Sequence, residues 1–139
     1  GLRNATYARF CGEEKASNSR VGCPIGAGDM RVYQRALELN RRLARSCSVI
    51  ERNDRDLFKQ LKNAASSIVL NIAEGIGTAG GTREMRFQTA LGSAREVKAC
   101  LEVAEAWGYL SVEHTLVTAE ADHVIGMLVK LVRARRRAR

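Results

Sequence analysis

The sequence predicts an all-α protein that folds as an antiparallel up-down-up-down four-helix bundle. Apolar residues recur at steps of three and four along four segments, which is the spacing of one face of a helix. Short polar or Gly-containing stretches separate these segments, and short connections place consecutive helices antiparallel. The single proline, Pro24, precedes all four segments and interrupts none of them. We expect a flexible leader at residues 1–28, the bundle at 29–135 and a basic tail at 136–139.

The first helix is expected at about residues 30–50, with the side chain of Asp29 capping its first turn. Its apolar stripe consists of Val32, Ala36, Leu39, Leu43, Cys47 and Ile50. The opposite face carries Arg31, Arg35, Arg41, Arg42 and Arg45, with only Glu38 to offset them. Two interpretations of these arginines stay open: a solvated helix face, or a face that contacts phosphates.

The second helix is expected at about residues 55–74, after a polar turn in which Asn53 or Asp54 is the cap. Its stripe consists of Leu57, Leu61, Ala64, Ile68 and Ile72. Small residues at 65–67 widen this stripe and allow a facing helix to approach closely. Gly75 is expected just past the helix end, where a left-handed backbone costs glycine little.

The third helix is expected at about residues 82–107, with Thr82 as its cap and Gly108 just past its end. Its stripe includes Phe87, Leu91, Ala94, either Val97 or Lys98, Leu101 and Ala104. A glycine inside a helix costs roughly 1 kcal/mol relative to alanine. Gly92, beside Ser93, is therefore expected to mark a close contact with another backbone.

The fourth helix is expected at about residues 112–135, capped by Ser111, with the stripe Val117, Ala121, Val124, Leu128 and Leu131. Its end is strongly basic and carries Lys130, Arg133, Arg135, Arg136, Arg137 and Arg139 without an acid. Cations are favoured at a helix C-terminus by the helix dipole. The same cations are suited to nucleic acid, and both interpretations stay open.

The formal net charge of +8 indicates a polyanionic partner, for which nucleic acid and an anionic membrane surface are the candidates. No run of 18 apolar residues occurs, so no transmembrane helix is expected. The first residues lack the apolar segment of a signal peptide, and we expect a cytoplasmic protein. Seven aromatic residues, including one tryptophan, are few for stacking on single-stranded bases.

No catalytic, metal-binding or cofactor-binding arrangement is evident, and we expect a protein that is not an enzyme. His114 and His123 are nine residues apart on one helix and point in different directions. Residues 75–81 are rich in glycine but lack the preceding strand and the following GK[ST] of a phosphate-binding loop. Cys47 and Cys100 fall on apolar stripes and are expected to be reduced core residues. Cys11 and Cys23 lie in the leader.

Three motifs resemble the four-helix bundle family of bacterial 23S rRNA intervening-sequence proteins, once called S23 ribosomal proteins. They are Ser67-Ile68-x-x-Asn71-Ile72-Ala73-Glu74-Gly75, Gly92-Ser93-x-x-Glu96 and Leu101-x-x-Ala104-x-x-x-Gly108-Tyr109-Leu110. The resemblance covers about residues 32–132. Family members are similar in fold to the accessory variability protein of diversity-generating retroelements, a basic homopentamer that binds nucleic acid and a reverse transcriptase. The resemblance therefore implies a non-enzymatic pentamer with a role linked to nucleic acid.

The polar residues of these motifs are Asn71, Glu74, Ser93 and Glu96. A short turn brings their two helices together, and we expect a polar network among them, neutralised by Arg83, Arg86 or Arg95. Such a network would fix helix register or form part of a subunit interface. Apolar residues outside the stripes favour self-association, namely Leu37, Val69, Val97, Ile125 and Val129.

Two hypotheses of function follow from the sequence. The first is a homo-oligomer, a pentamer by the resemblance, that binds RNA or DNA through phosphates with little sequence preference. Lys130 and the tail arginines would lead this binding, helped by Arg41, Arg42 and Arg45. The second is a structural or protein-binding scaffold, such as an accessory subunit of an enzyme.

Overall fold

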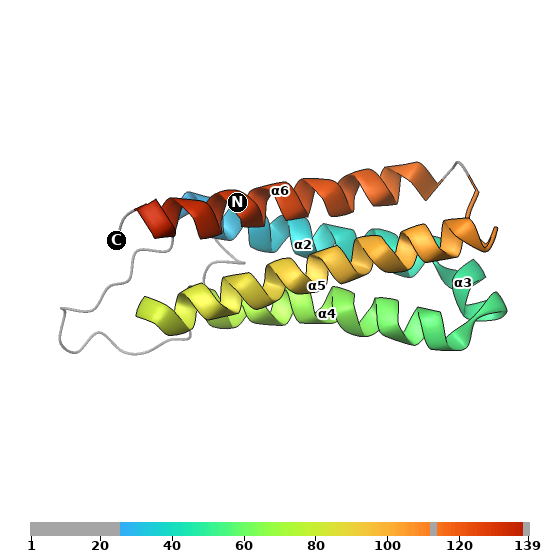
Figure 1. Ribbon diagram of the computed structural model, residues 1–139, viewed down its shortest axis with the longest axis horizontal. Helices are drawn as coiled ribbons and strands as arrows, with labels where there is room; N and C mark the ends of the chain where they lie inside the picture. The colour runs from blue at the N-terminus through green and yellow to red at the C-terminus, as the bar shows by residue number, and fades with distance from the viewer. Residues whose placement is uncertain (1–25, 112–113, 138–139) are drawn as a thin grey trace, which may run out of the picture.

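The computed structural model describes residues 26–111 and 114–137. Five helices form this part of the chain: α2 (Ala27–Ser46), α3 (Ser48–Asn53), α4 (Arg55–Ile76), α5 (Gly80–Ala106) and α6 (Thr115–Arg137). Four of them are long and lie side by side, and no strand occurs among the described residues (Figure 1). The prediction of an all-α bundle is confirmed.

The long helices pack as a closed ring in which α2 contacts α4 and α6, and α5 contacts the same two helices. Consecutive long helices run in opposite directions, so each end of the bundle collects two helix starts and two helix ends (Figure 1). We call the end with the first turn of α2 and the last turn of α6 the tail end. The opposite end, which holds α3, is called the α3 end.

The core consists mainly of the predicted stripes, but at the end of α6 the buried residue is Val132, and Leu131, which the stripe predicted, is only partly buried. The largest fully buried side chains are Phe87, Leu39, Ile50, Leu61, Ile68, Ile72, Leu101, Leu128, Val32, Val97, Val124 and Cys47. The buried residues of helix α5, which packs against both α4 and α6, include Val97. Val97 is the core residue of the two stripe candidates, and its other predicted role, as an apolar residue outside the stripes, is wrong. Leu37, Val69, Ile125 and Val129 are only partly buried.

The first helix differs from its prediction at both ends. It begins at Ala27, so Asp29 lies buried within the first turn and is not the cap. It ends at Ser46, and the separate six-residue helix α3 begins at Ser48. Burial continues through this break at Cys47 and Ile50, which is why the apolar pattern predicted one continuous helix. Asp54 then caps α4 by accepting a hydrogen bond of 2.9 Å from the Leu57 N–H.

The connection between α4 and α5 also differs from its prediction. Gly75 is a buried residue inside α4, which continues to Ile76 and is capped at Gly77. The left-handed backbone occurs at Gly80, with a φ of 65°, and Gly80 begins α5. Ala79 is the N-cap residue of α5, so Thr82 does not cap this helix. A β-carbon on Gly75 would lie 3.2 Å from Phe87 and 3.3 Å from Arg86. Glycine is therefore needed here because α5 packs closely against it, and not because the backbone is left-handed.

Gly92 does not make the close contact that its place in a helix suggested. It faces solvent, and no atom lies within 4 Å of where its β-carbon would be. Tight packing of α4 on α5 occurs instead at Gly75 and at the buried neighbour Ser93. Within one chain, the prediction for Gly92 is wrong.

The end of α5 confirms its prediction. Gly108 has a φ of 76°. The Gly108 and Tyr109 N–H groups donate to the carbonyls of Glu105 and Ala104 at 2.9 and 2.8 Å, which is a Schellman motif. Helix α6 begins at Thr115 and continues through Arg137, so residues 136 and 137 belong to the helix and not to a separate tail.

Cys47 and Cys100 are buried free thiols, as predicted. Burial raises the pKa of the Cys47 thiol to about 11, and burial together with the charge of Glu96 raises the pKa of Cys100. A thiol with a raised pKa keeps its proton in the folded state. Its contribution to stability is present below the unfolded pKa and is lost as pH rises from about 9 towards 11.

We therefore expect iodoacetamide at pH 8 to leave Cys47 and Cys100 unmodified in the native protein, because the thiolate is the reacting form. Both should be alkylated in urea. Mass spectrometry of the peptides separates these thiols from Cys11 and Cys23, which lie outside the described residues. Rapid native labelling of Cys47 would contradict its burial.

Candidate nucleic-acid interface

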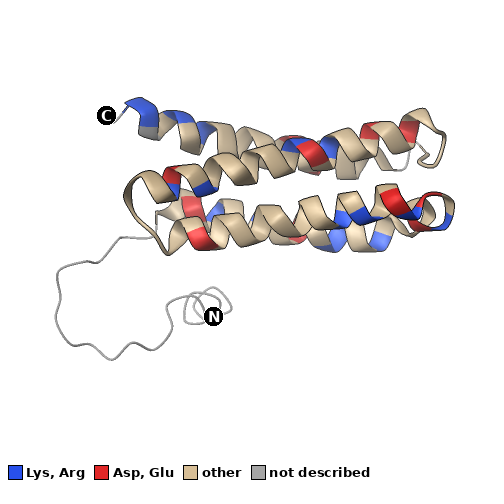
Figure 2. Ribbon diagram, turned by 60° about the horizontal axis from the view of Figure 1, so that its bottom comes forward, with Lys and Arg blue, Asp and Glu red and all other residues tan. Residues whose placement is uncertain are grey.

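The two basic groups that the sequence singled out lie at different places on the bundle. Arg41, Arg42 and Arg45 belong to the second half of α2, towards the α3 end. Lysine and arginine also follow the last turns of α6 beside the C-terminus (Figure 2). The described residues therefore do not form one continuous basic face from these two groups.

The arginines of α2 are more strongly neutralised than the sequence indicated. Glu38 forms ion pairs with Arg41, Arg42 and Arg45 at 3.5, 3.3 and 3.7 Å. The hydrogen bond from Arg42 is the main reason that the pKa of Glu38 is lowered. A second acid, Glu120 of α6, lies 3.8 Å from Arg42. Glu120 could not be assigned to this cluster from sequence, because the pairing of α2 with α6 is a property of the fold.

The end of α6 keeps its positive charge. Lys130, Arg133, Arg136 and Arg137 are all exposed, and the sequence beyond Asp122 contains no acid. Among them, Arg136 approaches Glu84 of α5 at 4.0 Å, at the limit of an ion pair. Arg135 lies in the same helical turns, although its side chain is outside the described set, and Arg139 lies beyond the described residues. The exposed cations stand on a regular helix, so their spacing is set by the helix.

Two grooves flank this end of α6. The α5–α6 groove, with a volume of about 350 Å³, brings Arg95 of α5 beside Arg133 and Arg136 of α6. Arg95 was a candidate to neutralise the polar network, whereas in the structure it lies beside the cations at the end of α6. Gly92 also lines this groove.

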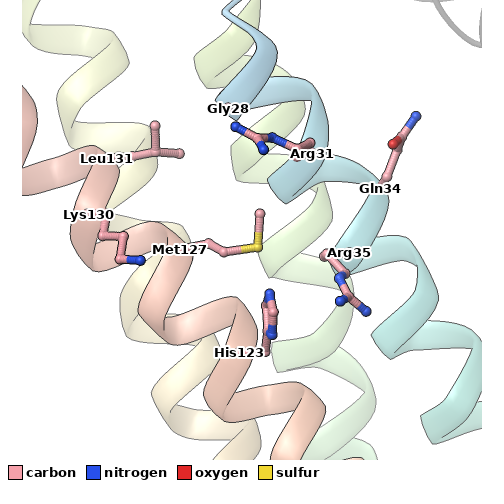
Figure 3. A pocket seen from close by; sticks show the side chains of 8 residues that line it. All are labelled: Gly28, Arg31, Gln34, Arg35, His123, Met127, Lys130 and Leu131. Carbon is pink, nitrogen blue, oxygen red and sulfur yellow. The ribbon is translucent and has the colours of Figure 1, made fainter.

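The α2–α6 groove lies on the other side of α6 and has a volume of about 590 Å³. Its charged and titratable residues are Arg31 and Arg35 of α2 and His123 and Lys130 of α6 (Figure 3). His123 is exposed and lines this groove. The missed signal was the antiparallel pairing of α2 and α6, which brings the first turns of one helix beside the last turns of the other.

Most of the expected polar network lies between α4 and α5. The Ser67 and Ser93 hydroxyl oxygens are 2.8 Å apart, and the Asn71 amide donates to the Ser67 carbonyl at 2.9 Å. Arg86 donates to the Asn71 side-chain oxygen at 3.4 Å and pairs with Glu74 at 2.8 Å. Glu96 is exposed and makes no hydrogen bond with these groups. The arrangement holds two helices of one chain together and offers no site for chemistry.

Arg83 has a different partner from the one expected. Its guanidinium pairs with Asp29 of α2, and both side chains are at most 5% exposed. It also donates to the Gly75 carbonyl at 2.8 Å and lies 5.0 Å from the centre of the Phe87 ring. Sequence reasoning missed this buried pair because 54 residues separate its members and Asp29 had a plausible local role as a cap.

The described ranges contain neither a metal site nor a membrane-spanning helix. Within residues 26–111 and 114–137, no group of three or more His, Cys, Asp or Glu side chains is placed to hold a metal ion. No described helix combines the length and apolar character that crossing a bilayer requires.

The fold and the charge distribution define a class of protein: an antiparallel helical bundle whose exposed cations gather at the end of its last helix. The chain belongs to the family described as 23S rRNA-intervening sequence protein, which it matches over residues 28–130. The resemblance noted in the sequence motifs is thus confirmed.

A solved structure with a similar fold comes from Bacteroides thetaiotaomicron and is described as a protein with unknown function from the S23 ribosomal protein family. Its TM-score is 0.67 at 19% identity, with coverage of 76% of this chain and 98% of that chain. At this identity the likeness shows the fold alone. Neither description names a catalytic activity. A search of curated proteins found no match.

Proposed function

We propose that this protein is a non-enzymatic cytoplasmic homo-oligomer that binds RNA or DNA through phosphate contacts with little sequence preference. The observation that carries the proposal is the set of exposed cations on the last turns of α6, namely Lys130, Arg133, Arg136 and Arg137. Only Arg136 approaches an acid among the described residues, so the others are available to phosphates. Arg135 and Arg139 belong to the same segment of sequence.

Low sequence preference follows from the chemistry of this surface. Lysine and arginine contacts to phosphates position a protein on nucleic acid without reading its bases. Base reading requires side chains that reach groove edges or stack on exposed bases. Trp107, the one tryptophan, lies at the end of α5, far along the bundle from the tail end. The binding energy is therefore mainly electrostatic.

Assembly of several copies would multiply this weak binding. On α4 and α5, Leu70, Met85 and Val103 are 61, 55 and 43% exposed, so one chain leaves these apolar side chains uncovered. Exposed apolar patches often mark interfaces. Gly92 and Ala99 share the outward face of α5 with Met85 and Val103 and would let another helix approach closely. A pentamer is the state that the family resemblance implies. Several tails on one body would bind a long polyanion with avidity.

Replacing Arg133, Arg135, Arg136, Arg137 and Arg139 with glutamine should abolish most nucleic-acid binding. The fold should stay intact, because Arg133, Arg136 and Arg137, the three whose side chains the structure describes, are exposed. For the wild type, the logarithm of affinity for a duplex should fall by roughly 0.9 per log unit of salt for each phosphate neutralised. Filter binding to a random-sequence duplex and to a structured RNA, at two salt concentrations, measures both effects. The variant should show a much shallower salt dependence.

A variant with Arg41, Arg42 and Arg45 replaced by glutamine is the matched control. These arginines are already paired with Glu38 and Glu120, so we expect a smaller loss of affinity than for the tail variant. Equal losses in the two variants would contradict a leading role for the tail. Light scattering should find an oligomer in all three proteins, and a monomer at micromolar concentration would contradict self-association.

A protein-binding scaffold is the second candidate function. Trp107 and Leu116 are 71 and 68% exposed near the α3 end, which is the opposite end from the basic tail. Exposed tryptophan is typical of surfaces that bind other proteins. A partner enzyme, such as the reverse transcriptase implied by the resemblance, would be the kind of protein bound. Absence of nucleic-acid binding by the wild type at low salt would favour this function.

A further inference from the structure

The side chains that line the α2–α6 groove carry a positive charge that no acidic lining residue balances. Eight residues line it: Gly28, Arg31, Gln34, Arg35, His123, Met127, Lys130 and Leu131. None of them is acidic. Glu120, near the rim, holds Arg35 at 3.3 Å. In the described part of the chain, Arg31 and Lys130 are exposed and pair with no acid.

These side chains converge from two helices. Three cations, Arg31, Arg35 and Lys130, together with the carboxylate of Glu120, give a formal charge of +2. Figure 3 shows Met127 and His123 reaching from α6 towards α2, whereas Gln34 points away from α6. The groove is thus an electropositive slot between helices and not a solvated face of one helix.

The floor of the groove is apolar. Met127 and Leu131 supply it, and Gly28 adds no side chain at the end nearest the start of α2. A β-carbon on Gly28 would lie 3.6 Å from Leu131, so a larger residue there would occupy the groove. The volume of about 590 Å³ lies in the range of sites for small molecules. The groove can therefore accept a ligand with an apolar body as well as an anionic group.

We propose that the α2–α6 groove binds the phosphate monoester of a nucleotide. A phosphate monoester carries a charge of about −2 at neutral pH, which matches the formal charge of the groove. A phosphodiester carries a single negative charge and no free end. Arg31 and Lys130 contact the phosphate, while Met127 and Leu131 contact the sugar or base. The monoester belongs either to a free nucleotide or to the 5′-phosphorylated end of a strand.

This site is separate from the tail cations of the proposed function. Arg31 lies on α2 and lines this groove, whereas Arg133 and Arg136 line the groove on the other side of α6. Lys130 belongs to both the tail segment and this site. Arg31 is therefore the diagnostic residue, and the glutamine-substituted tail variant should keep its binding to a nucleotide.

Isothermal titration of the full chain at low salt with adenosine 5′-monophosphate and with adenosine tests the proposal. We expect the monophosphate to bind at least about tenfold more tightly than adenosine, since hydrogen bonds to charged groups are the stronger ones. Arg31→Gln should weaken monophosphate binding by a similar factor. Arg41→Gln is the matched control, because Arg41 lies on the same helix outside the groove, and it should leave binding unchanged.

Gly28→Leu tests the groove without removing a charge. It should weaken binding of the monophosphate, while thermal unfolding checks that the bundle is intact. If Gly28→Leu fails to fold, the comparison of Arg31→Gln with Arg41→Gln still decides. Equal affinity for the monophosphate and adenosine, or equal effects of these two arginine substitutions, would overturn the proposal.

Short oligonucleotides with a 5′-phosphate and a 5′-hydroxyl distinguish the two sources of the monoester. A preference for the 5′-phosphate that disappears in Arg31→Gln, with weaker binding of the free nucleotide, assigns the groove to strand ends. Tighter binding of the free nucleotide assigns it to a small ligand. Loss of duplex binding in the tail variant with retained monophosphate binding keeps this site distinct from the proposed function.

Discussion

Removal of either member of the buried pair, Asp29 or Arg83, should destabilise the bundle by about 3–5 kcal/mol. Both side chains are almost fully buried, so removing one leaves the charge of the other in the protein interior, without a partner and without access to water. The pair also joins the first turn of α2 to the start of α5. Asp29→Ala and Arg83→Met, followed by urea unfolding, measure the two costs.

The larger cost is expected for Arg83→Met. Arg83 also donates to the Gly75 carbonyl at the end of α4 and lies beside the Phe87 ring, so three helices lose a contact at once. Asp29→Ala leaves those two contacts in place. The difference between the two losses of unfolding free energy therefore measures what Arg83 contributes beyond the ion pair itself.

A double variant, Asp29→Leu with Arg83→Met, supplies the control. Replacing both members of a buried pair with apolar residues is often neutral or stabilising. We expect the double variant to be more stable than the sum of the single changes predicts. Single substitutions that cost less than about 1 kcal/mol would contradict burial of the pair.

Gly75→Leu is expected to have the second-largest effect, a loss of roughly 1–3 kcal/mol or more. A first carbon at this position already meets Phe87 at 3.2 Å and Arg86 at 3.3 Å, and a leucine adds three more. The surroundings are stiff, because Phe87 is fully buried and Arg86 is held by Asn71 and Glu74. Thermal and urea unfolding measure the loss.

Gly92→Leu is the matched control, because it is the same substitution at another helical glycine. Open space surrounds Gly92, and leucine is the better helix former, so the fold should be unchanged or stabilised by up to about 1 kcal/mol. If Gly92 lies at a subunit interface, the variant should assemble less well, which light scattering detects. Unfolding of a monomeric Gly92→Leu chain at lower urea than wild type would contradict its exposed position.

The helices could be predicted from sequence because their apolar stripes are strict. Val32, Leu61, Leu101 and Leu128 all fall where the four-three spacing placed them, and all are buried. The end of α5 was also predictable, since Gly108 followed by an apolar run is a local signal. Periodicity and capping are local properties of a chain.

The features that the sequence predicted wrongly depend on contacts between distant segments. Gly75 and Gly80 are both glycines of one Gly-rich stretch, and only the approach of Phe87 decides which is buried inside α4. The partner of Asp29 is 54 residues away, and Glu120 reaches Arg35, which is 85 positions earlier. No spacing rule within one helix identifies such partners.

The candidate site was predicted in part for the same reason. The basic run at the end of α6 is contiguous in sequence and needed no fold to be seen. Arg95, Arg31 and His123 join the two flanking grooves only when α5, α2 and α6 are placed side by side. Residues of this kind look like ordinary surface residues until the helices are paired.

The charge pattern along α6 affects how fast, and in which orientation, the protein meets a polyanion. Glu120 and Asp122 lie in its first half, and the cations from Lys130 onward lie in its second half, so the helix carries a lengthwise electrical polarity. A polyanion would attract one end of the molecule and turn it during diffusion, before any contact forms. The association rate should therefore fall with ionic strength, and productive collisions should begin at the tail end.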